Sequence, residues 1–259
     1  MIPEQPKPLL EIRNVARVFG GLKALENVSF NVPRGAICGL IGPNGAGKTT
    51  LINMISGLGP LSEGAILLDG QLISGLAPHK IAERGVGRTF QNIRLFGDLS
   101  VLENVILGHH LRQRGTLIET LLRLPRSRSG ERDSRTAALK LLAILGMEHL
   151  ANVQARALSY GDQRRVEIAR ALALGPSLLL LDEPAAGMNS TETDGLCEFL
   201  LSLRESSLTI LIIEHDMDMI MRMSDLVVVL NFGLKIAEGP PDFVRNEPHV
   251  IEAYLGSEQ

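Results

Sequence analysis

A glycine-rich segment, GPNGAGKTT, carries the clearest chemical pattern in the sequence. It fits G-x-x-x-x-G-K-S/T at every fixed position, between an apolar stretch and a helix-like one. Glycines let such a loop turn backbone N–H groups toward a phosphate, the lysine reaches the β- and γ-phosphates, and the threonine hydroxyl coordinates Mg²⁺. The alternative is a glycine-rich turn that merely joins a strand to a helix. We predict a nucleotide site comprising Gly42, Pro43, Asn44, Gly45, Ala46, Gly47, Lys48, Thr49 and Thr50.

Two acids follow a run of four leucines in SLLLLDEP. Such a run is typical of a fully buried parallel strand, so Asp182 at its tip is placed to hold Mg²⁺. Glu183 projects in another direction and could polarise an attacking water. The alternative is two acids that end a strand in solvent. The phosphate motif favours the catalytic interpretation.

A histidine, His215, follows another apolar stretch, LTILIIE. At a strand end its ring can hydrogen-bond a γ-phosphate or the catalytic water, although a lone histidine is more often structural. His109 and His110 are neighbours on an expected helix and do not share a face, so we expect both in solvent.

Apolar periodicity predicts the elements that must position these residues. Strand-like alternation and buried runs alternate with helical patterns, which indicates an α/β fold with a largely parallel central sheet. A helical insertion is expected from about 99 to 150, with an exposed loop or frayed helix end at 124–135. Expected strands are 9–19, 26–32, 36–42, 63–73, 85–91, 177–184 and 208–216, followed by a hairpin turning at Phe232-Gly233 and by short helices in the tail.

Composition limits the functional classes. The net charge of −3 gives no global reason to expect nucleic-acid binding, and 3 % aromatic residues without tryptophan argue against a base-stacking surface. Cys38 and Cys197 lie in apolar surroundings, so we expect buried free thiols. The start lacks the apolar region of a signal peptide, and no apolar run approaches the length of a membrane span.

Several motifs in this order resemble those of the ATP-binding cassette ATPases, over nearly the whole chain. Beside the glycine-rich loop, the Asp182-Glu183 strand end and His215, the matches are Gln91 in RTFQNIRLF as the Q-loop glutamine, LSYGDQ as the signature, AAGMN as a D-loop-like segment, and Phe19 as the aromatic that stacks on adenine.

The resemblance implies a P-loop NTPase core with a mainly parallel sheet, an N-terminal antiparallel β subdomain and a helical signature-bearing subdomain at 92–165, within one domain spanning 1–259. Such cassettes pair head to tail around two ATP molecules, so that Ser159 and Gly161 would complete the partner's site. Mg²⁺ would be held through Thr49, Gln91 and Asp182. Catalysis would rest on Glu183 as general base, with Lys48 and His215 stabilising the transition state.

Within the family, the sequence looks like the ATPase subunits of bacterial branched-chain amino acid importers. FGGLKALENVSF, LSYGDQRRVEIARALA and the tail VIEAYLG support this subgroup. The departures from the general pattern are Tyr160 and Asp162 in the signature, Asn189 in the D-loop and Phe19 for a tyrosine. The subgroup shares such changes, so we do not interpret them as loss of activity, although they leave the D-loop hydrogen bonds open.

The sequence therefore predicts an ATP-hydrolysing subunit of a membrane importer for branched-chain amino acids, attached peripherally to the cytoplasmic face of the membrane. Expected partners are a second ATPase subunit, identical or paralogous, and permease subunits near Gln91 and the helical insertion, with a periplasmic or extracellular binding protein acting indirectly. The alternatives are lipopolysaccharide export, urea or short-amide uptake, and a soluble cassette ATPase of DNA repair or translation. A structural partner with a dead site is disfavoured by intact Lys48, Asp182, Glu183 and His215.

Overall fold

A six-stranded sheet with the order β10-β9-β3-β8-β7-β6 forms the centre of the computed structural model, which describes residues 7–110, 125–204 and 207–255. The strands from β9 to β6 are parallel, whereas β10 pairs antiparallel with β9. Every residue of β3, β7 and β8 is buried, as in strands covered on both faces. The bounds are β3 Ile37–Ile41, β6 Val86–Arg88, β7 Leu178–Asp182, β8 Thr209–Ile213, β9 Leu226–Asn231 and β10 Leu234–Gly239.

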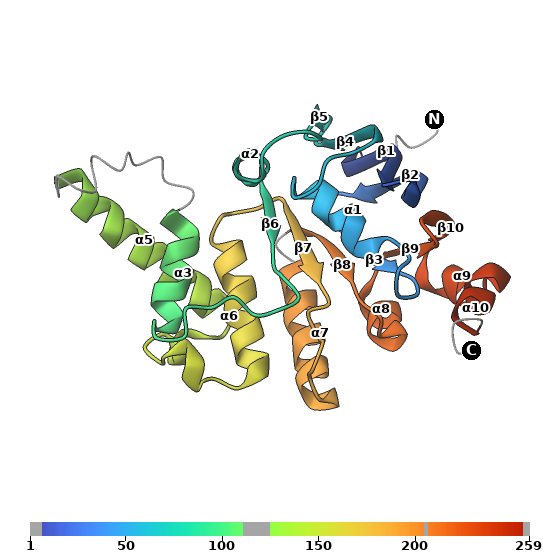
Figure 1. Cartoon of the computed structure of the whole chain (residues 1–259). Coiled ribbons are helices and arrows are strands. Elements are labelled where there is room, and N and C mark those ends of the chain that lie inside the picture. Colours follow the sequence, from blue (N-terminus) through green and yellow to red (C-terminus); the bar gives the residue numbers. More distant parts are fainter. Residues whose placement is uncertain (1–6, 111–124, 205–206, 256–259) are drawn as a thin grey trace, which may run out of the picture.

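A second, antiparallel sheet precedes it in the chain and has the order β2-β1-β4-β5. Its strands are β1 Pro8–Phe19, β2 Leu22–Pro33, β4 Glu63–Leu68 and β5 Gln71–Leu72. One hydrophobic core joins both sheets through helix α1, Lys48–Ile55, which lies between them in Figure 1. Both the parallel sheet and the N-terminal antiparallel sheet were expected from the sequence and are confirmed.

Figure 1 shows all the remaining helices. They are α2 Pro78–Glu83, α3 Val101–His110, α5 Pro125–Ile144, α6 Tyr160–Leu172, α7 Ser190–Arg204, α8 Met217–Met223, α9 Pro241–Arg245 and α10 Pro248–Leu255, with single 3₁₀ turns at Glu148–Leu150 and Ala155–Ala157. Helices α6, α7, α8, α9 and α10 contribute to a second core on the other face of the parallel sheet, whereas Ile81 of α2 belongs to the first core.

Helices α3, α5 and α6 form a group at one end of the molecule (Figure 1). They bury a core of their own that includes Val101, Leu142 and Val166. Of the two alternatives expected for 124–135, the exposed loop is wrong for residues 125–135, which form the N-terminal end of α5. Arginine and glutamate are good helix formers, so a polar segment can be helical without burying an apolar face. Part of the insertion, 111–124, lies outside the described residues.

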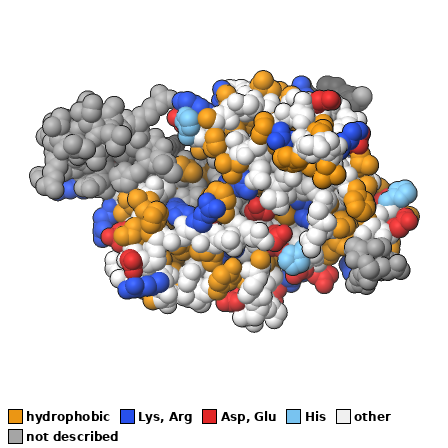
Figure 2. Space-filling model, viewed as in Figure 1, with side chains coloured by type: hydrophobic (Ala, Val, Ile, Leu, Met, Phe, Trp, Pro, Cys, Tyr) orange, Lys and Arg blue, Asp and Glu red, His pale blue; other side chains and the backbone are white. Residues whose placement is uncertain are grey.

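Two other expectations from the sequence, the hairpin and the buried cysteines, are also met. The hairpin of β9 and β10 turns at Phe232-Gly233, and both cysteines are buried and free. Among the described helices, none is long and apolar enough to cross a bilayer. Acidic and basic side chains are interspersed over the face drawn in Figure 2.

Candidate nucleotide-binding site

The phosphate loop, residues Gly42–Thr50, runs from the end of β3 into α1. Gly42, Gly45 and Gly47 have φ angles of 147°, 80° and 101°, which favour glycine. A Cβ on Gly42 would lie 2.0 Å from the carbonyl oxygen of Leu230, and one on Gly47 would lie 2.6 Å from a methyl of Leu25. Close packing therefore excludes a side chain at two of the three glycines.

Lys48 is buried inside this loop. Its Nζ donates hydrogen bonds to the carbonyl oxygens of Gly42 (2.6 Å) and Pro43 (3.0 Å). Burial lowers the pKa of the ammonium, and the negative charges of Glu183 and Asp182 act in the opposite direction. The structure thus brings the lysine near the two acids that follow the leucine run.

Asp182 ends β7 and pairs with an arginine from the neighbouring strand β6. The Arg88 guanidinium donates to Asp182 Oδ2 (3.2 Å) and to Ser56 Oγ (2.6 Å), and the Arg88 and Asp182 side chains are 9 % and 7 % exposed. Burial raises the pKa of Asp182, and Arg88 opposes this effect. Sequence reasoning missed Arg88, because its connection with Asp182 depends on strand pairing across 94 positions of the chain.

Glu183 and Gln91 meet beside this pair. Gln91 Nε2 donates to Glu183 Oε2 over 2.9 Å. Glu183 has a positive φ of 46°, and its backbone N–H donates to the carbonyl oxygen of Ile213 (2.9 Å). The proposed general base and the Q-loop glutamine are therefore in direct contact.

His215 lies after β8, which pairs with β7 so that Ile213 faces Asp182. Its side chain is 66 % exposed, and Nδ1 lies 3.5 Å from Oε2 of the fully buried Glu214. Parallel pairing of β7 and β8 thus places both acids and the histidine at one edge of the sheet.

Phe19, at the end of β1, reaches the same region. Its ring is half exposed, and the Arg17 guanidinium lies 4.3 Å from the ring centroid. A hollow of about 290 Å³ is lined by Arg17, Phe19 and Thr50, together with Asn53, Met54 and Leu58–Pro60. The structure thus joins the predicted adenine-stacking ring to the phosphate loop.

The signature residues lie elsewhere, at the start of α6. Ser159 caps this helix: its Oγ accepts the backbone N–H of Asp162 (3.1 Å) and donates to Asp162 Oδ2 (2.9 Å). Gly161 is buried near Glu192 of α7. Within the described residues, no hydrogen bond links Ser159 or Gly161 to the phosphate loop. The chain does not bring its own signature and phosphate loop together.

Two departures from the family pattern have a local structural explanation. Asn189 caps α7, since its Oδ1 accepts the N–H of Glu192 (3.0 Å) while its own N–H donates to Glu192 Oε2 (3.1 Å). Tyr160 packs beside Gly187, where a Cβ would lie 3.7 Å from the Tyr160 ring. The signature and D-loop segments of one chain are thus in contact.

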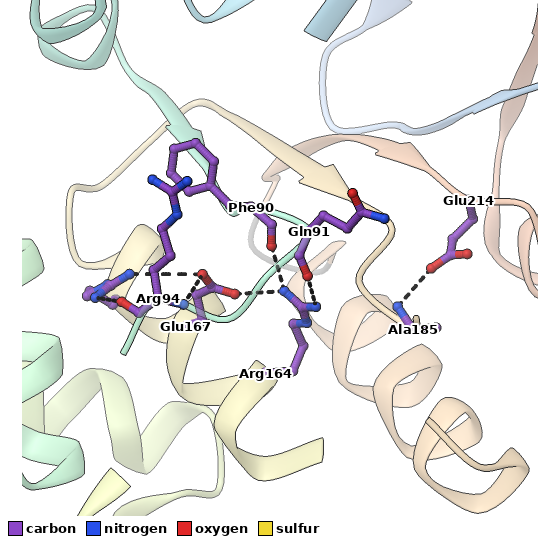
Figure 3. A network of polar contacts seen from close by, with 8 residues as sticks. Phe90, Gln91, Arg94, Arg164, Glu167, Ala185 and Glu214 are labelled. Atoms are coloured by element: carbon purple, nitrogen blue, oxygen red, sulfur yellow. Dashed lines mark hydrogen bonds and ion pairs between the residues drawn. The ribbon is translucent and has the colours of Figure 1, made fainter. Parts of the chain in front are cut away.

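Buried charges connect α6 with the Q-loop (Figure 3). Arg164, which is 0 % exposed, donates to the carbonyl oxygens of Phe90 and Gln91 (both 2.7 Å) and to Glu167 Oε2 (2.8 Å). Glu167 Oε1 accepts the backbone N–H of Arg94 (3.2 Å). Sequence reasoning missed this network, although an arginine and a glutamate three positions apart within the apolar pattern of a helix could have indicated it.

The C-terminal helix also contacts the phosphate loop. The Tyr254 hydroxyl, on α10, lies beside the backbone of Gly42, which acts to lower its pKa. Burial raises the pKa of Tyr254 to about 12. The sequence contained no signal for this contact.

The expectation that His109 is solvated is wrong. Its ring is partly buried, with Nδ1 3.2 Å from Ser134 Oγ, because α3 packs against α5. The side chain of His110 lies outside the described residues. Within the described part of the chain, no cluster of three or more histidine, cysteine or acidic side chains could hold a metal ion.

Comparison with family models identifies two matching segments. Residues 25–186 match the family described as "ABC transporter". Residues 235–259 match the family described as "Branched-chain amino acid ATP-binding cassette transporter".

Known proteins resemble the chain over almost its full length. It is 44 % identical to the high-affinity branched-chain amino acid transport ATP-binding protein LivG of Escherichia coli, covering 96 % of this chain and 98 % of that protein. The lipopolysaccharide export ATP-binding protein LptB of the same species is 36 % identical with the same coverage. A crystal structure of MJ1267, an ATP-binding cassette of an ABC transporter in its ADP conformation, superposes with a TM-score of 0.84 at 33 % identity, covering 96 % of this chain and 99 % of that one.

Proposed function

The chain is an ATPase subunit of the ABC transporter family, and from this premise we propose that it powers a membrane importer for branched-chain amino acids. One observation supports the cargo best: a family model described by this cargo matches the C-terminal residues 235–259. LptB, with lipopolysaccharide as its cargo, has the lower identity of 36 %. Urea or short amides remain the alternative to test.

We assign ATP binding to the phosphate loop and Phe19. Backbone N–H groups of the loop and the start of α1 suit the phosphates, and Lys48 reaches the β- and γ-phosphates. The hollow shared by Phe19 and Thr50 supports stacking of the adenine on the Phe19 ring. The family includes a cassette solved in an ADP conformation, in line with nucleotide binding here.

Hydrolysis is an in-line displacement at the γ-phosphorus. Glu183 accepts a proton from water as the water oxygen attacks, and the bond to the β–γ bridging oxygen breaks with its electron pair leaving on ADP. His215 donates a hydrogen bond to a γ-phosphate oxygen, and Lys48 offsets the developing charge. The contact of Gln91 with Glu183 supports a role of the glutamine in orienting the base and the water.

The residues present suit Mg²⁺. Thr49, Asp182 and Gln91 offer a hydroxyl, a carboxylate and an amide oxygen, all oxygen ligands that Mg²⁺ prefers. Magnesium in nucleotide sites takes one or two protein ligands beside phosphate oxygens and water, so a cluster of three acidic or histidine side chains is not needed. The bound ion would neutralise phosphate charge.

ABC ATPase subunits act as dimers with transmembrane permease partners, and we propose that this chain does so from the cytoplasmic face of the membrane. Helices α1 and α6 pack into different hydrophobic cores, which supports a composite site completed by Ser159 and Gly161 of a second subunit. We assign permease contact to the surface near Gln91 and to a helical subdomain at 92–165 within the 1–259 cassette. The hydrogen bonds from Arg164 of α6 to the carbonyls of Phe90 and Gln91 support a coupling between this permease surface and the nucleotide site.

The cargo is tested by co-purifying the chain with its permease subunits and binding protein in vesicles. Leucine, isoleucine or valine should stimulate ATP hydrolysis, whereas urea, short amides and lipopolysaccharide should not. Stimulation by one of the latter and not by leucine would contradict the proposal.

The composite site is tested with Ser159→Arg. The bulky cation should block ATP-driven dimerisation, measured by light scattering with Glu183→Gln in the background, while the monomer still binds ATP. Loss of ATP binding in the monomer would instead place Ser159 in the site of its own subunit.

A further inference from the structure

A buried carboxylate, Glu214, lies between the two residues assigned to the hydrolytic step. It follows β8 directly and is 0 % exposed. Strand pairing places it beside the chain that leaves β7, where Glu183 begins the next loop. Its position next to the site was not anticipated from the sequence.

Both carboxylate oxygens of Glu214 accept hydrogen bonds, and Figure 3 shows the one from Ala185. Oε1 accepts the backbone N–H of Ala185 (2.8 Å), and Oε2 accepts the backbone N–H of His215 (3.2 Å). Oε2 also lies 3.5 Å from Nδ1 of the His215 ring. The Glu214 side chain therefore binds both the loop after Glu183 and the backbone of His215, at the end of β8.

The backbone of Glu183 requires such support. Its φ of 46° is a conformation that residues other than glycine adopt at an energetic cost and that persists where surrounding contacts fix it. The N–H of Glu183 is anchored to Ile213, and two residues later the N–H of Ala185 is anchored to Glu214. Both anchors belong to the end of β8.

We propose that Glu214 is a positioning residue for ATP hydrolysis, which fixes the loop of Glu183 and the ring of His215 in one arrangement. The inference rests on the assignment of Glu183 as base and His215 as phosphate ligand. It adds a residue that is assigned no contact with ATP or the attacking water. Glu214 acts through Glu183 and His215.

A carboxylate suits this position better than an amide. An ionised carboxylate only accepts hydrogen bonds, so it satisfies two N–H donors and attracts a proton on Nδ1 at the same time. When both ring nitrogens of His215 carry a proton, Nδ1–H faces Glu214 and Nε2–H is left to donate to the phosphate. Glutamine would direct its NH₂ group at one of these donors. The charged groups acting on Glu214 are His215 and Glu183.

The kinetic test is Glu214→Gln in the full chain. We expect kcat to fall by about 10- to 100-fold, the usual effect of removing such an outer partner, with the Kd for ATP unchanged. Rates are divided by the concentration of chain that binds ATP, so that a loss of folded protein does not lower the measured kcat. The matched control is Asp225→Asn, which removes a carboxylate that accepts the N–H of Ile37 (2.9 Å) at the opposite end of β3, and which should keep the wild-type kcat. An unchanged kcat in Glu214→Gln, or an equal loss in the control, would overturn the proposal.

Two further measurements separate positioning from stability. In a His215→Ala background Glu214→Gln should have a smaller effect, because one of the two groups through which it acts is gone; an undiminished factor would contradict action through His215. The ¹⁵N spectrum of the His215 ring, assigned with His215→Ala, should show a proton on Nδ1 in the wild type and its redistribution in Glu214→Gln. This spectrum needs no turnover, so it tests the inference even if the wild-type chain fails to hydrolyse ATP and the proposed function falls.

Discussion

Gln91 donates its side-chain N–H to the carboxylate of Glu183 across 2.9 Å, although the two residues are 92 positions apart. Gln91 also belongs to the segment whose backbone carbonyl is held by Arg164 of α6. The side chain of Gln91 points away from Arg164, toward the end of β7 (Figure 3). One residue thus connects the acid assigned as general base with the helix that begins at the signature, and displacement of α6 would reach Glu183 through a single side chain.

Glu183→Gln should keep ATP binding and lower kcat by about 10²- to 10⁴-fold, because the amide cannot accept the proton of the attacking water. Gln91→Leu should lower kcat less, since the base remains but loses the donor that orients it. Single-turnover phosphate release measures both. Hydrolysis at the wild-type rate in Glu183→Gln would show that another group is the base.

The buried pair of Arg164 and Glu167 should be strongly coupled. Arg164→Met leaves the buried Glu167 carboxylate with only the longer ion pair to Arg170 (4.0 Å) and removes the donor to the Phe90 and Gln91 carbonyls, so we expect the free energy of unfolding to fall by about 3–5 kcal/mol. Replacing both, as Arg164→Met with Glu167→Leu, should recover part of this loss. Urea unfolding of the two single variants and the double variant provides the cycle. Additive losses would mean that the pair is not a unit.

Much of the site could be predicted because its functional residues lie in short, contiguous motifs. The glycines and Lys48 of the phosphate loop are contiguous, so the sequence alone indicates the backbone conformation of the loop. The leucine run before Asp182 has the composition of a strand buried on both faces. The alternation of such strands with helical patterns similarly determined the sheet type. The choice between a loop and a helix end at 125–135 stayed open, because polarity alone does not distinguish a solvated helix from a loop.

The partners of the predicted residues could not be predicted. Arg88 reaches Asp182 across a pair of parallel strands, and Glu214 reaches Ala185 from the next strand. Tyr254 reaches Gly42 from the last helix of the described chain. These contacts depend on the order of the strands and on the packing of the helices. A sequence pattern within one segment indicates neither the strand order nor the helix packing.

Stability should depend on pH through Glu214. Burial raises the pKa of this carboxyl above its ordinary value of 4.5, against the effect of the N–H groups of Ala185 and His215. The folded chain then binds the proton more tightly than the unfolded chain. The associated stabilisation is present below about pH 4.5 and is lost as pH rises through the folded pKa.

Glutamine at this position does not titrate. The free energy of unfolding of Glu214→Gln minus that of the wild type should therefore increase as pH rises from about 4.5, and level off once folded Glu214 is ionised. Guanidinium unfolding at a series of pH values measures the difference. A difference that decreases with pH would mean that the folded state favours the ionised carboxylate.

The glycines of the phosphate loop should differ in their tolerance of a methyl group. At Gly45 a Cβ would meet no atom within 4 Å, so Gly45→Ala carries only the strain of its positive φ, about 1–2 kcal/mol. At Gly42 the Cβ would lie 2.0 Å from the Leu230 carbonyl oxygen, a backbone atom that cannot turn aside. Gly42→Ala should therefore lower the free energy of unfolding by more than about 3 kcal/mol, since overlap adds to strain. It should also displace the carbonyl of residue 42 that Lys48 contacts, and so weaken ATP binding. Urea unfolding together with titration of a fluorescent ATP analogue compares the two variants, and equal destabilisation would show that φ, rather than the approach of Leu230, requires glycine at position 42.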